Sequence, residues 1–177
     1  MAHPLNKLLQ PLHRRVMLML SRARLNITDD ASGLQRAQVS ALDGEVRDDV
    51  ERFQQFGLSA HPPAGAEVLM ASLGGSRDHP VIFAVDDRRH RPAGLMAGET
   101  VLYNLAGVEI RLLEDNSVLI KSSLKVRIET DRLEVTGEII DHCDDGGRSM
   151  RESREIYNGH HHPETNGVRT LTPEETM

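Results

Sequence analysis

The sequence predicts a mainly β protein: an N-terminal helix, then a small closed barrel such as an OB-fold, then short strands typical of a β-helix. Two observations lead to this prediction. Residues 33–105 hold about five short apolar runs separated by turn residues, which is typical of a small barrel. Residues 107–140 repeat one apolar face in strands of about five residues at a short period, the pattern of a β-helix.

Composition suits small β units better than one large core. The chain has 177 residues, of which 38% are hydrophobic, with no Trp, two Tyr and three Phe. So few aromatic side chains favour small units along an axis, or a core completed by other subunits. The net charge of −6 argues against a nucleic-acid surface, which is normally basic. The single Cys143 excludes an intrachain disulfide.

No segment predicts a membrane span or a signal peptide. Apolar runs stay well short of the ~20 residues that a spanning helix needs. The apolar run at residues 16–20 is too short for a signal-peptide core, and Arg22 and Arg24 follow it without a clear cleavage site. We therefore expect the chain to be made in the cytoplasm.

The N-terminal segment, residues 1–30, is predicted to be helical. Within it, residues 4–24 carry apolar side chains at three- and four-residue steps, as an amphipathic helix requires. Pro11 should kink this helix or delay its start. The helix either docks on another protein or packs on its own domain, and the pattern does not separate the two.

The next segment, residues 31–106, is predicted to form the barrel. Its strands are expected at residues 34–42, 67–73, 80–85 and 99–104, with a turn at 43–44 and loops at 61–65 and 86–92. The run at 80–85 is almost wholly apolar, so we expect burial on both faces. Residues 48–57 predict a short helix or an irregular connection.

The third segment, residues 107–150, is predicted to be the β-helix shaft. Apolar residues alternate with charged ones at 108–112, 118–120, 124–128 and 133–135. Barely four such strands cannot enclose a core, so other copies of the chain should complete it. The alternative is an antiparallel meander packed on the barrel. Residues 141–151 read as a solvated Gly-rich turn in preference to a calcium loop or a His142–Cys143 catalytic pair.

The last segment, residues 151–177, holds three consecutive histidines. In an extended backbone His160 and His162 would share one face and His161 the other. Three copies around a threefold axis would then surround one point with six imidazoles, which suits an octahedral transition metal better than tetrahedral zinc. A purification-tag fragment or a solvated loop would also explain the run. After Pro163 the chain should fold back, with a turn at residues 166–167.

Several segments together resemble the central spike proteins of Mu-like contractile-tailed bacteriophages, the baseplate assembly protein V group. The segments that carry the resemblance are residues 73–80 (LGGSRDHP), 85–89 (VDDRR), 91–92, 98–99, 133–139 (LEVTGEI), 144–150 (DDGGRSM), and Tyr157-Asn158 followed by a His-any-His tip. No single segment is decisive, whereas their order and spacing are specific. The middle position of the tip is His161 here, where the family members have threonine or another small polar residue.

The resemblance implies a homotrimer that pierces the host outer membrane and performs no catalysis. Its OB-fold would form a collar on the tail tube and baseplate hub, and three intertwined chains would form a triple-stranded β-helix. At the apex, His160 and His162 of each chain would bind one iron ion per trimer, and some members also hold calcium and chloride. The implied location is the tip of the tail baseplate in the virion, with assembly in the host cytoplasm.

Two other functions fit parts of the sequence. A metal-dependent hydrolase could use the histidines with Glu164 or Asp145, although such an enzyme needs an open coordination position. An OB-fold module could bind an oligonucleotide or a saccharide. The negative charge and the scarcity of aromatic residues in the barrel segment argue against that second function.

Overall fold

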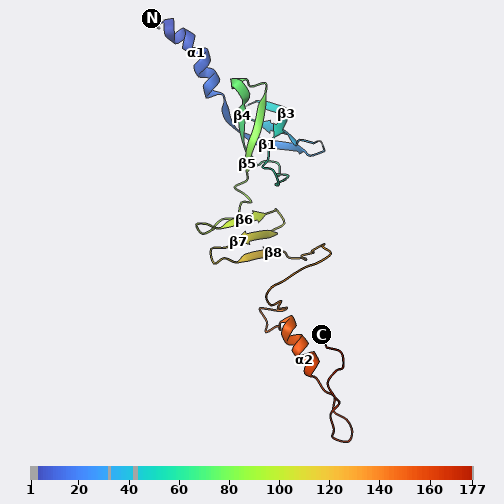
Figure 1. The fold of residues 1–177 in the computed structure, drawn as a ribbon. Helices are drawn as coiled ribbons and strands as arrows, with labels where there is room; N and C mark the ends of the chain where they lie inside the picture. Colours follow the sequence, from blue (N-terminus) through green and yellow to red (C-terminus); the bar gives the residue numbers. More distant parts are fainter. Residues whose placement is uncertain (1–3, 32, 42–43, 177) are drawn as a thin grey trace. The chain divides into compact units, whose positions relative to one another are not determined.

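A helix, a closed barrel, a small sheet and a second helix follow one another along the chain (Figure 1). The computed structural model describes residues 4–31, 33–41 and 44–176. Two compact units, Met1–Leu124 and Lys125–Met177, divide the chain. The first unit holds α1 (Pro4–Met17), β1 (Leu20–Asp29), β2 (Arg36–Ser40), β3 (Val46–Arg52), β4 (Glu67–Ser72), the 3₁₀ turn η1 (Leu73–Gly75), β5 (Pro80–Asp86), β6 (Thr100–Tyr103), β7 (Glu109–Leu112) and β8 (Val118–Lys121). The second holds α2 (Met150–Gly159).

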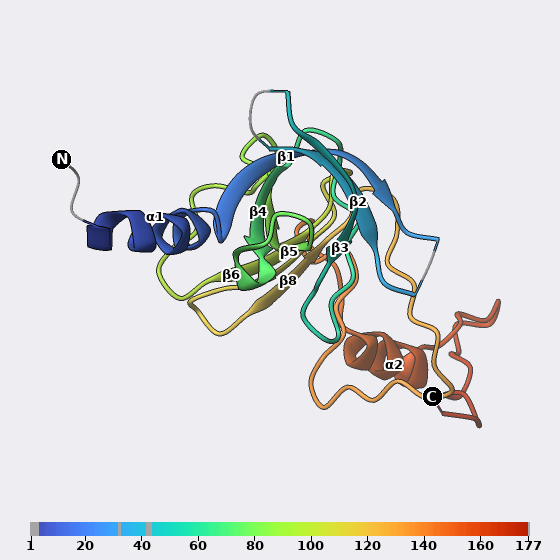
Figure 2. The ribbon, with the colours of Figure 1, turned by 90° about the horizontal axis from the view of Figure 1, so that it is seen from above.

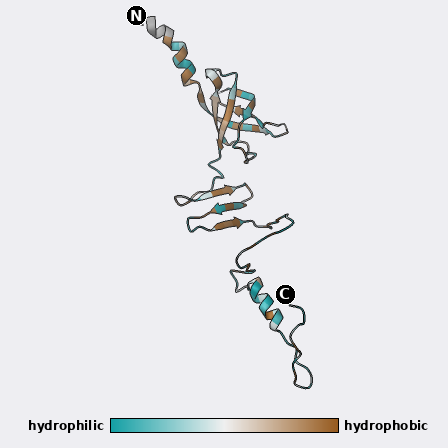
Figure 3. Cartoon of the chain, in the orientation of Figure 1, coloured by the Kyte–Doolittle hydropathy of each residue, from teal (hydrophilic) through white to brown (hydrophobic). Residues whose placement is uncertain are grey.

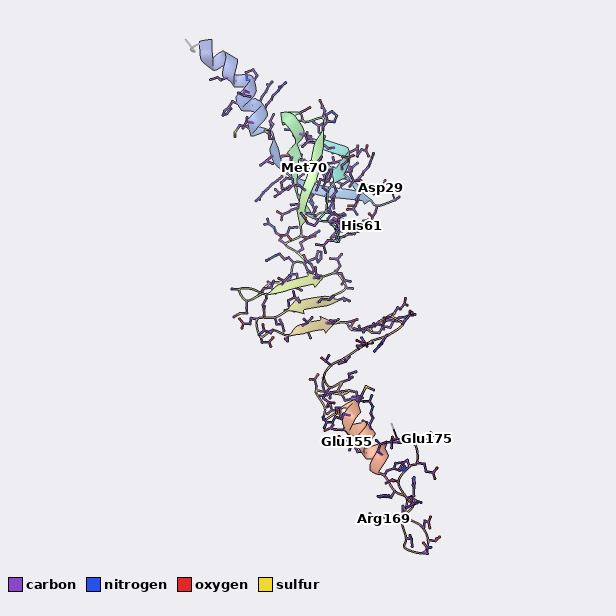
Figure 4. All side chains as sticks on the ribbon, in the orientation of Figure 1. Asp29, His61, Met70, Glu155, Arg169 and Glu175 are labelled. Atoms are coloured by element: carbon purple, nitrogen blue, oxygen red, sulfur yellow. The ribbon has the colours of Figure 1, made fainter. Side chains whose placement is uncertain are left out.

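Strands β1 to β5 form the closed barrel, in the order β1-β2-β3-β5-β4 (Figure 2). All neighbours run antiparallel except β3 and β5, which are parallel. Alternate side chains point inward and make the core, which includes Met70, labelled in Figure 4. The buried apolar residues are Leu25, Ala37, Val39, Val50, Ala66, Val68, Met70 and Ile82. The predicted strands in 34–42, 67–73 and 80–85 are therefore confirmed.

The helix prediction over residues 4–24 is wrong beyond Met17. Residues 20–24 lie in β1, where Leu20 pairs with Ala71 and Arg24 with Glu67 of β4. Small Ser21 and Ala23 point toward the interior while the arginines point out, an alternation that the apolar helical spacing concealed. The barrel therefore starts before residue 31. The start of α1 is not delayed, and the helix continues through Pro11.

The surroundings of α1 leave both predictions for this helix open. A Cβ placed on Gly75 of η1 would lie 2.9 Å from the Cβ of Arg15, so helix and barrel meet closely there. Leu12 and Val16 remain exposed. No helix in the described part of the chain is long and apolar enough to cross a bilayer.

The expectation for residues 48–57, a short helix or an irregular connection, is wrong for residues 48–52, which belong to β3, and the irregular connection is confirmed for residues 53–57. The register between β2 and β3 shifts between Ala37 and Val39, so that two residues of β3 stand opposite one of β2. Asp49 at this bulge has a φ of 58°. The extra residue breaks the period of two that would have identified a strand. Beyond the bulge, Val50 and Arg52 are both buried.

Two further expectations about the barrel are wrong. Strand β5 is not buried on both faces, since Phe83 is 48% exposed. The strand expected at 99–104 exists as β6, but it pairs with β7 in a separate three-stranded sheet and takes no part in the barrel. The turn predicted at residues 43–44 includes Asp43, which lies outside the described residues. The loop at 61–65 is confirmed, and the loop expected at 86–92 is confirmed from residue 87, since Asp86 ends β5.

The antiparallel sheet β6-β7-β8 has one apolar face that is exposed in the part of the chain that the structure describes. Its register places Leu102, Ile110 and Ile120 in one row, beside a row of Thr100, Leu112 and Val118. Their apolar members are 40–61% exposed. Figure 3, which colours the chain by hydropathy, shows β8 mainly in the hydrophobic colour. On the opposite face the Glu109 carboxylate accepts a hydrogen bond of 2.7 Å from the Arg111 guanidinium. Such a continuous exposed apolar face indicates an interaction surface.

The remaining predicted shaft strands, at 124–128 and 133–135, are not strands in this single chain. Leu124, Val126, Ile128, Leu133 and Val135 are all at least half exposed. Their alternation with charged residues persists, as in the ion pairs Arg127–Glu129 and Arg132–Glu134. A strand is stabilised by hydrogen bonding to a neighbouring strand, and among the described residues of one chain no strand pairs with this segment.

Asp87 supplies a pH-dependent contribution to the barrel. Its carboxylate accepts hydrogen bonds from the backbone N–H, Nε and Nη2 of Arg89. The Arg89 Nη2 also donates to the carbonyl of Ala64, at 3.0 Å, and so ties the end of β5 to the loop before β4. These bonds to Arg89 lower the pKa of Asp87 from 3.8 to about 2.

We expect the barrel to lose stability as the pH falls from about 4 toward 2, and Asp87→Asn to weaken that dependence. The folded pKa lies below the unfolded value, so the contribution is present above pH 4 and disappears on protonation of the native carboxylate. Urea midpoints at a series of pH values measure it. Asp78→Asn, which removes an exposed carboxylate, is the matched control. Equal slopes for wild type and Asp87→Asn between pH 4 and 2 would contradict the assignment.

Candidate metal centre

A short helix, α2, leads into the histidine run. Its first turn is a capping box: the Ser149 hydroxyl accepts from the Glu152 N–H, and the Glu152 carboxylate accepts from the Ser149 N–H. Both bonds satisfy donors that a helix start leaves free. This helix is not among the elements predicted from the sequence, although Ser149 followed three residues later by Glu152 is a recognised start signal.

The Gly-rich segment before α2 forms a tight turn. The N–H groups of Asp145 and Gly147 both donate to the His142 carbonyl, at 2.9 and 3.0 Å. A Cβ on Gly147 would lie 1.6 Å from the carbonyl oxygen of Asp141, so only glycine fits there. Cys143 is exposed. The turn prediction for this segment is confirmed.

His160 and His162 lie side by side, as the alternation of an extended backbone predicts. The helix ends at Gly159, and His160 takes extended dihedral angles of −75° and 149°. The ring centroids of His160 and His162 are then 5.1 Å apart, with the ring planes at 89°. His161 lies between them in the chain and is exposed. Two imidazoles are thus available at one point of each chain.

The hydrogen bonding of His160 defines its tautomer. Its Nδ1 lies 2.5 Å from the carbonyl oxygen of Tyr157. Because a carbonyl oxygen only accepts, Nδ1 is the donor of this bond, and in the neutral imidazole the lone pair is then on Nε2. A ligating histidine normally makes this kind of bond through its second nitrogen. The Tyr157 ring lies beside the imidazole, with centroids 5.3 Å apart.

His162 begins a hairpin that turns the chain back after Pro163. The N–H of His162 donates to the Thr170 hydroxyl at 2.8 Å, and the N–H of Thr170 donates to the His162 carbonyl at 3.0 Å. Pro163 bridges to Arg169, which Figure 4 labels, and Gly167 has the positive φ of 80° that the turn requires. The predicted fold-back is confirmed. Thr170 was not identified from the sequence, since a lone threonine carries no pattern.

The donor set of one chain is incomplete for a metal. Among the described residues, no three His, Cys, Asp or Glu side chains gather at one point. Glu164 and Asp145, the candidates for a hydrolase, therefore do not join the histidines in a common ligand group. Two neighbouring imidazoles fit an octahedral iron or another transition ion only when other copies of the chain supply further nitrogens.

Comparison with known proteins identifies similar sequences. Residues 22–89, most of the barrel, match the family described as "Bacteriophage Mu Gp45, N-terminal". The chain is 43% identical over 136 residues to "Mu-like prophage FluMu protein gp45" of Haemophilus influenzae, an alignment that covers 77% of this chain and 74% of that protein. It is 39% identical over 142 residues to "Baseplate puncturing device gp45" of Escherichia phage Mu, with 76% and 72% covered.

Proposed function

Since the chain belongs to the bacteriophage Mu Gp45 family, we propose that it forms the central spike of a contractile phage tail baseplate and pierces the host outer membrane. It is a structural baseplate protein and not an enzyme. The name of the phage Mu relative, a puncturing device, supports the piercing role. Its place is the virion baseplate, and within it we propose the tip, reached after assembly in the host cytoplasm.

The exposed apolar face of β6-β7-β8 is the observation that carries the proposal of a homotrimer. Its five large apolar side chains are already 40–61% exposed rather than fully exposed, so their complete burial would contribute about half of the roughly 1.5–3 kcal/mol that a fully exposed side chain gains. In a trimer the three faces would meet on the axis, and residues 107–150 of each chain would continue as a triple-stranded β-helix. The alternation of apolar and charged residues at 124–128 and 133–135 supports this, because each strand would have one inner and one outer face.

The barrel would be an OB-fold that serves as the collar. Five strands in the order β1-β2-β3-β5-β4, closed by a parallel β3–β5 contact, are consistent with that fold. Its proposed partners are the baseplate hub and the tail tube proteins. Nucleic acid is not among them, because the chain carries a net charge of −6.

At the apex, His160 and His162 of three chains would hold one iron ion. The side-by-side rings and the protonated Nδ1 of His160 support this assignment. The ion would tie the three chains together, and a site filled by six imidazoles would have no open position for catalysis. Calcium and chloride, which the resemblance implies for some spikes, have no assigned ligands in this chain.

The mechanical role follows from this construction. Intertwined strands satisfy each other's backbone groups and leave no free edge to peel under load. The metal would fix the register of the chains at the point of greatest stress. Sheath contraction would supply the force, so the spike would only need to stay folded.

A native mass spectrum of the untagged protein tests the proposal. A trimer with one transition-metal ion is the expected species. A metal-free monomer would contradict both the shaft and the tip.

A further inference from the structure

We propose that the C-terminal hairpin, residues 162–170, is a positioning element for the metal tip and that the Thr170 hydroxyl holds His162 in place. The inference rests on the proposed iron site, and it assigns a role to a segment that lies beyond the His-any-His motif. Thr170 would be a positioning residue that does not itself touch the metal.

The two proposed ligands lie in a short segment that hydrogen bonds fix at both ends. His160 follows directly on α2, whose end is defined by the bond from the His160 N–H to the Tyr157 carbonyl, at 3.4 Å. His162 is held from the other side by both its N–H and its carbonyl, each bonded to Thr170. Only His161 lies between His160 and His162. The hydrogen bonds at these two histidines therefore act as two anchors that fix the spacing and orientation of their backbones.

The two anchors act on different parts of the ligands. At His160 the Tyr157 carbonyl accepts from Nδ1, which orients the ring and leaves Nε2 for the metal. At His162 the anchor is on the backbone, so the ring is placed through its Cα. Each chain therefore carries its two ligands in a prepared arrangement before the three chains meet, which lowers the ordering cost of binding.

The hydrogen bond that the Thr170 hydroxyl accepts can be removed without removing the other hydrogen bonds of the hairpin. The bond from the Thr170 N–H to the His162 carbonyl and the turn bond from the Glu164 N–H to the Val168 carbonyl, at 2.8 Å, do not use it. Thr170→Val removes only the acceptor for the His162 N–H and keeps the shape and β-branching of the side chain. Thr170→Ser keeps the hydroxyl. Thr165→Val, in the turn of the same hairpin, is the matched control.

We expect Thr170→Val to weaken iron binding by the full-length trimer about tenfold, the lower end of the loss that follows removal of an outer-shell partner, because this bond holds the His162 backbone and not its ring. Thr170→Ser and Thr165→Val should bind as the wild type does. Chelator competition measures the affinity. Amide exchange in metal-free protein supplies a readout independent of iron: the His162 N–H should exchange faster in Thr170→Val only.

The outcomes separate this inference from the function on which it rests. Wild-type affinity and unchanged His162 exchange in Thr170→Val would overturn the positioning role while leaving the iron tip intact. Faster exchange with unchanged affinity would also overturn it, since the bond would exist without serving the metal. A wild-type trimer that binds no iron would overturn the proposed tip, and the inference with it.

Discussion

Replacement of Ile120 by Asp is expected to convert the proposed trimer to monomers, whereas replacement of its neighbour Leu119 by Asp is not. The two residues are adjacent in β8 and similarly exposed in the single chain, at 52% and 45%. They lie on opposite faces of the sheet: Ile120 stands in the apolar row with Ile110, and Leu119 pairs with Arg111. In the proposed trimer the first face is buried on the axis and the second is exposed to water.

The size of the effect follows from charge burial. An unpaired carboxylate in an apolar interface costs several kcal/mol, and the threefold axis would bring three of them together. Exposed substitutions, in contrast, usually change stability by no more than about 0.5 kcal/mol. Light scattering after gel filtration gives the mass of each variant directly. A trimeric Ile120→Asp protein, or a monomeric Leu119→Asp protein, would contradict the assignment of the two faces.

The second large effect is expected at the tip. The double variant His160→Ala/His162→Ala should lose iron completely, since it removes both imidazoles that each chain brings to the point. Elemental analysis of the purified trimer measures the metal content. The trimer should persist, because the shaft holds most of the proposed buried surface.

His161→Ala is the control for this tip experiment. It removes an adjacent imidazole from the same run and should leave one metal ion per trimer. Full metal content in the double variant would exclude His160 and His162 as the ligands. Loss of metal in His161→Ala would instead show that the middle residue binds.

The strands that could be predicted from the sequence are those in which the apolar pattern is regular and fits no other secondary structure. Strands β2, β4 and β5 were predicted because their apolar residues alternate or cluster between turn residues. Strand β1 was missed because its inward residues Ser21 and Ala23 are small, and the flanking leucines also fit a helix. Strand β3 was missed because a bulge at Asp49 shifts the alternation.

The candidate site divides in the same way. His160 and His162 could be predicted because their imidazole side chains and their two-residue spacing are visible in the sequence itself. The supporting groups could not be: the Tyr157 carbonyl is a backbone atom, and Thr170 reaches His162 only once the chain has turned. For the exposed face of β6-β7-β8, the sequence indicated only that the chain has too few strands to enclose a core. Which face stays exposed depends on the tertiary structure and could not be predicted.

That face also has a consequence for how the protein is made. If the shaft strands are buried only by sister chains, a newly translated polypeptide cannot finish folding alone, and its yield rises steeply with the local abundance of nascent copies. Until the other two chains bind, Leu102, Ile110 and Ile120 remain exposed and can take part in non-native association. Assembly of the spike would then depend on translation of many copies from one messenger RNA, close together in space and time.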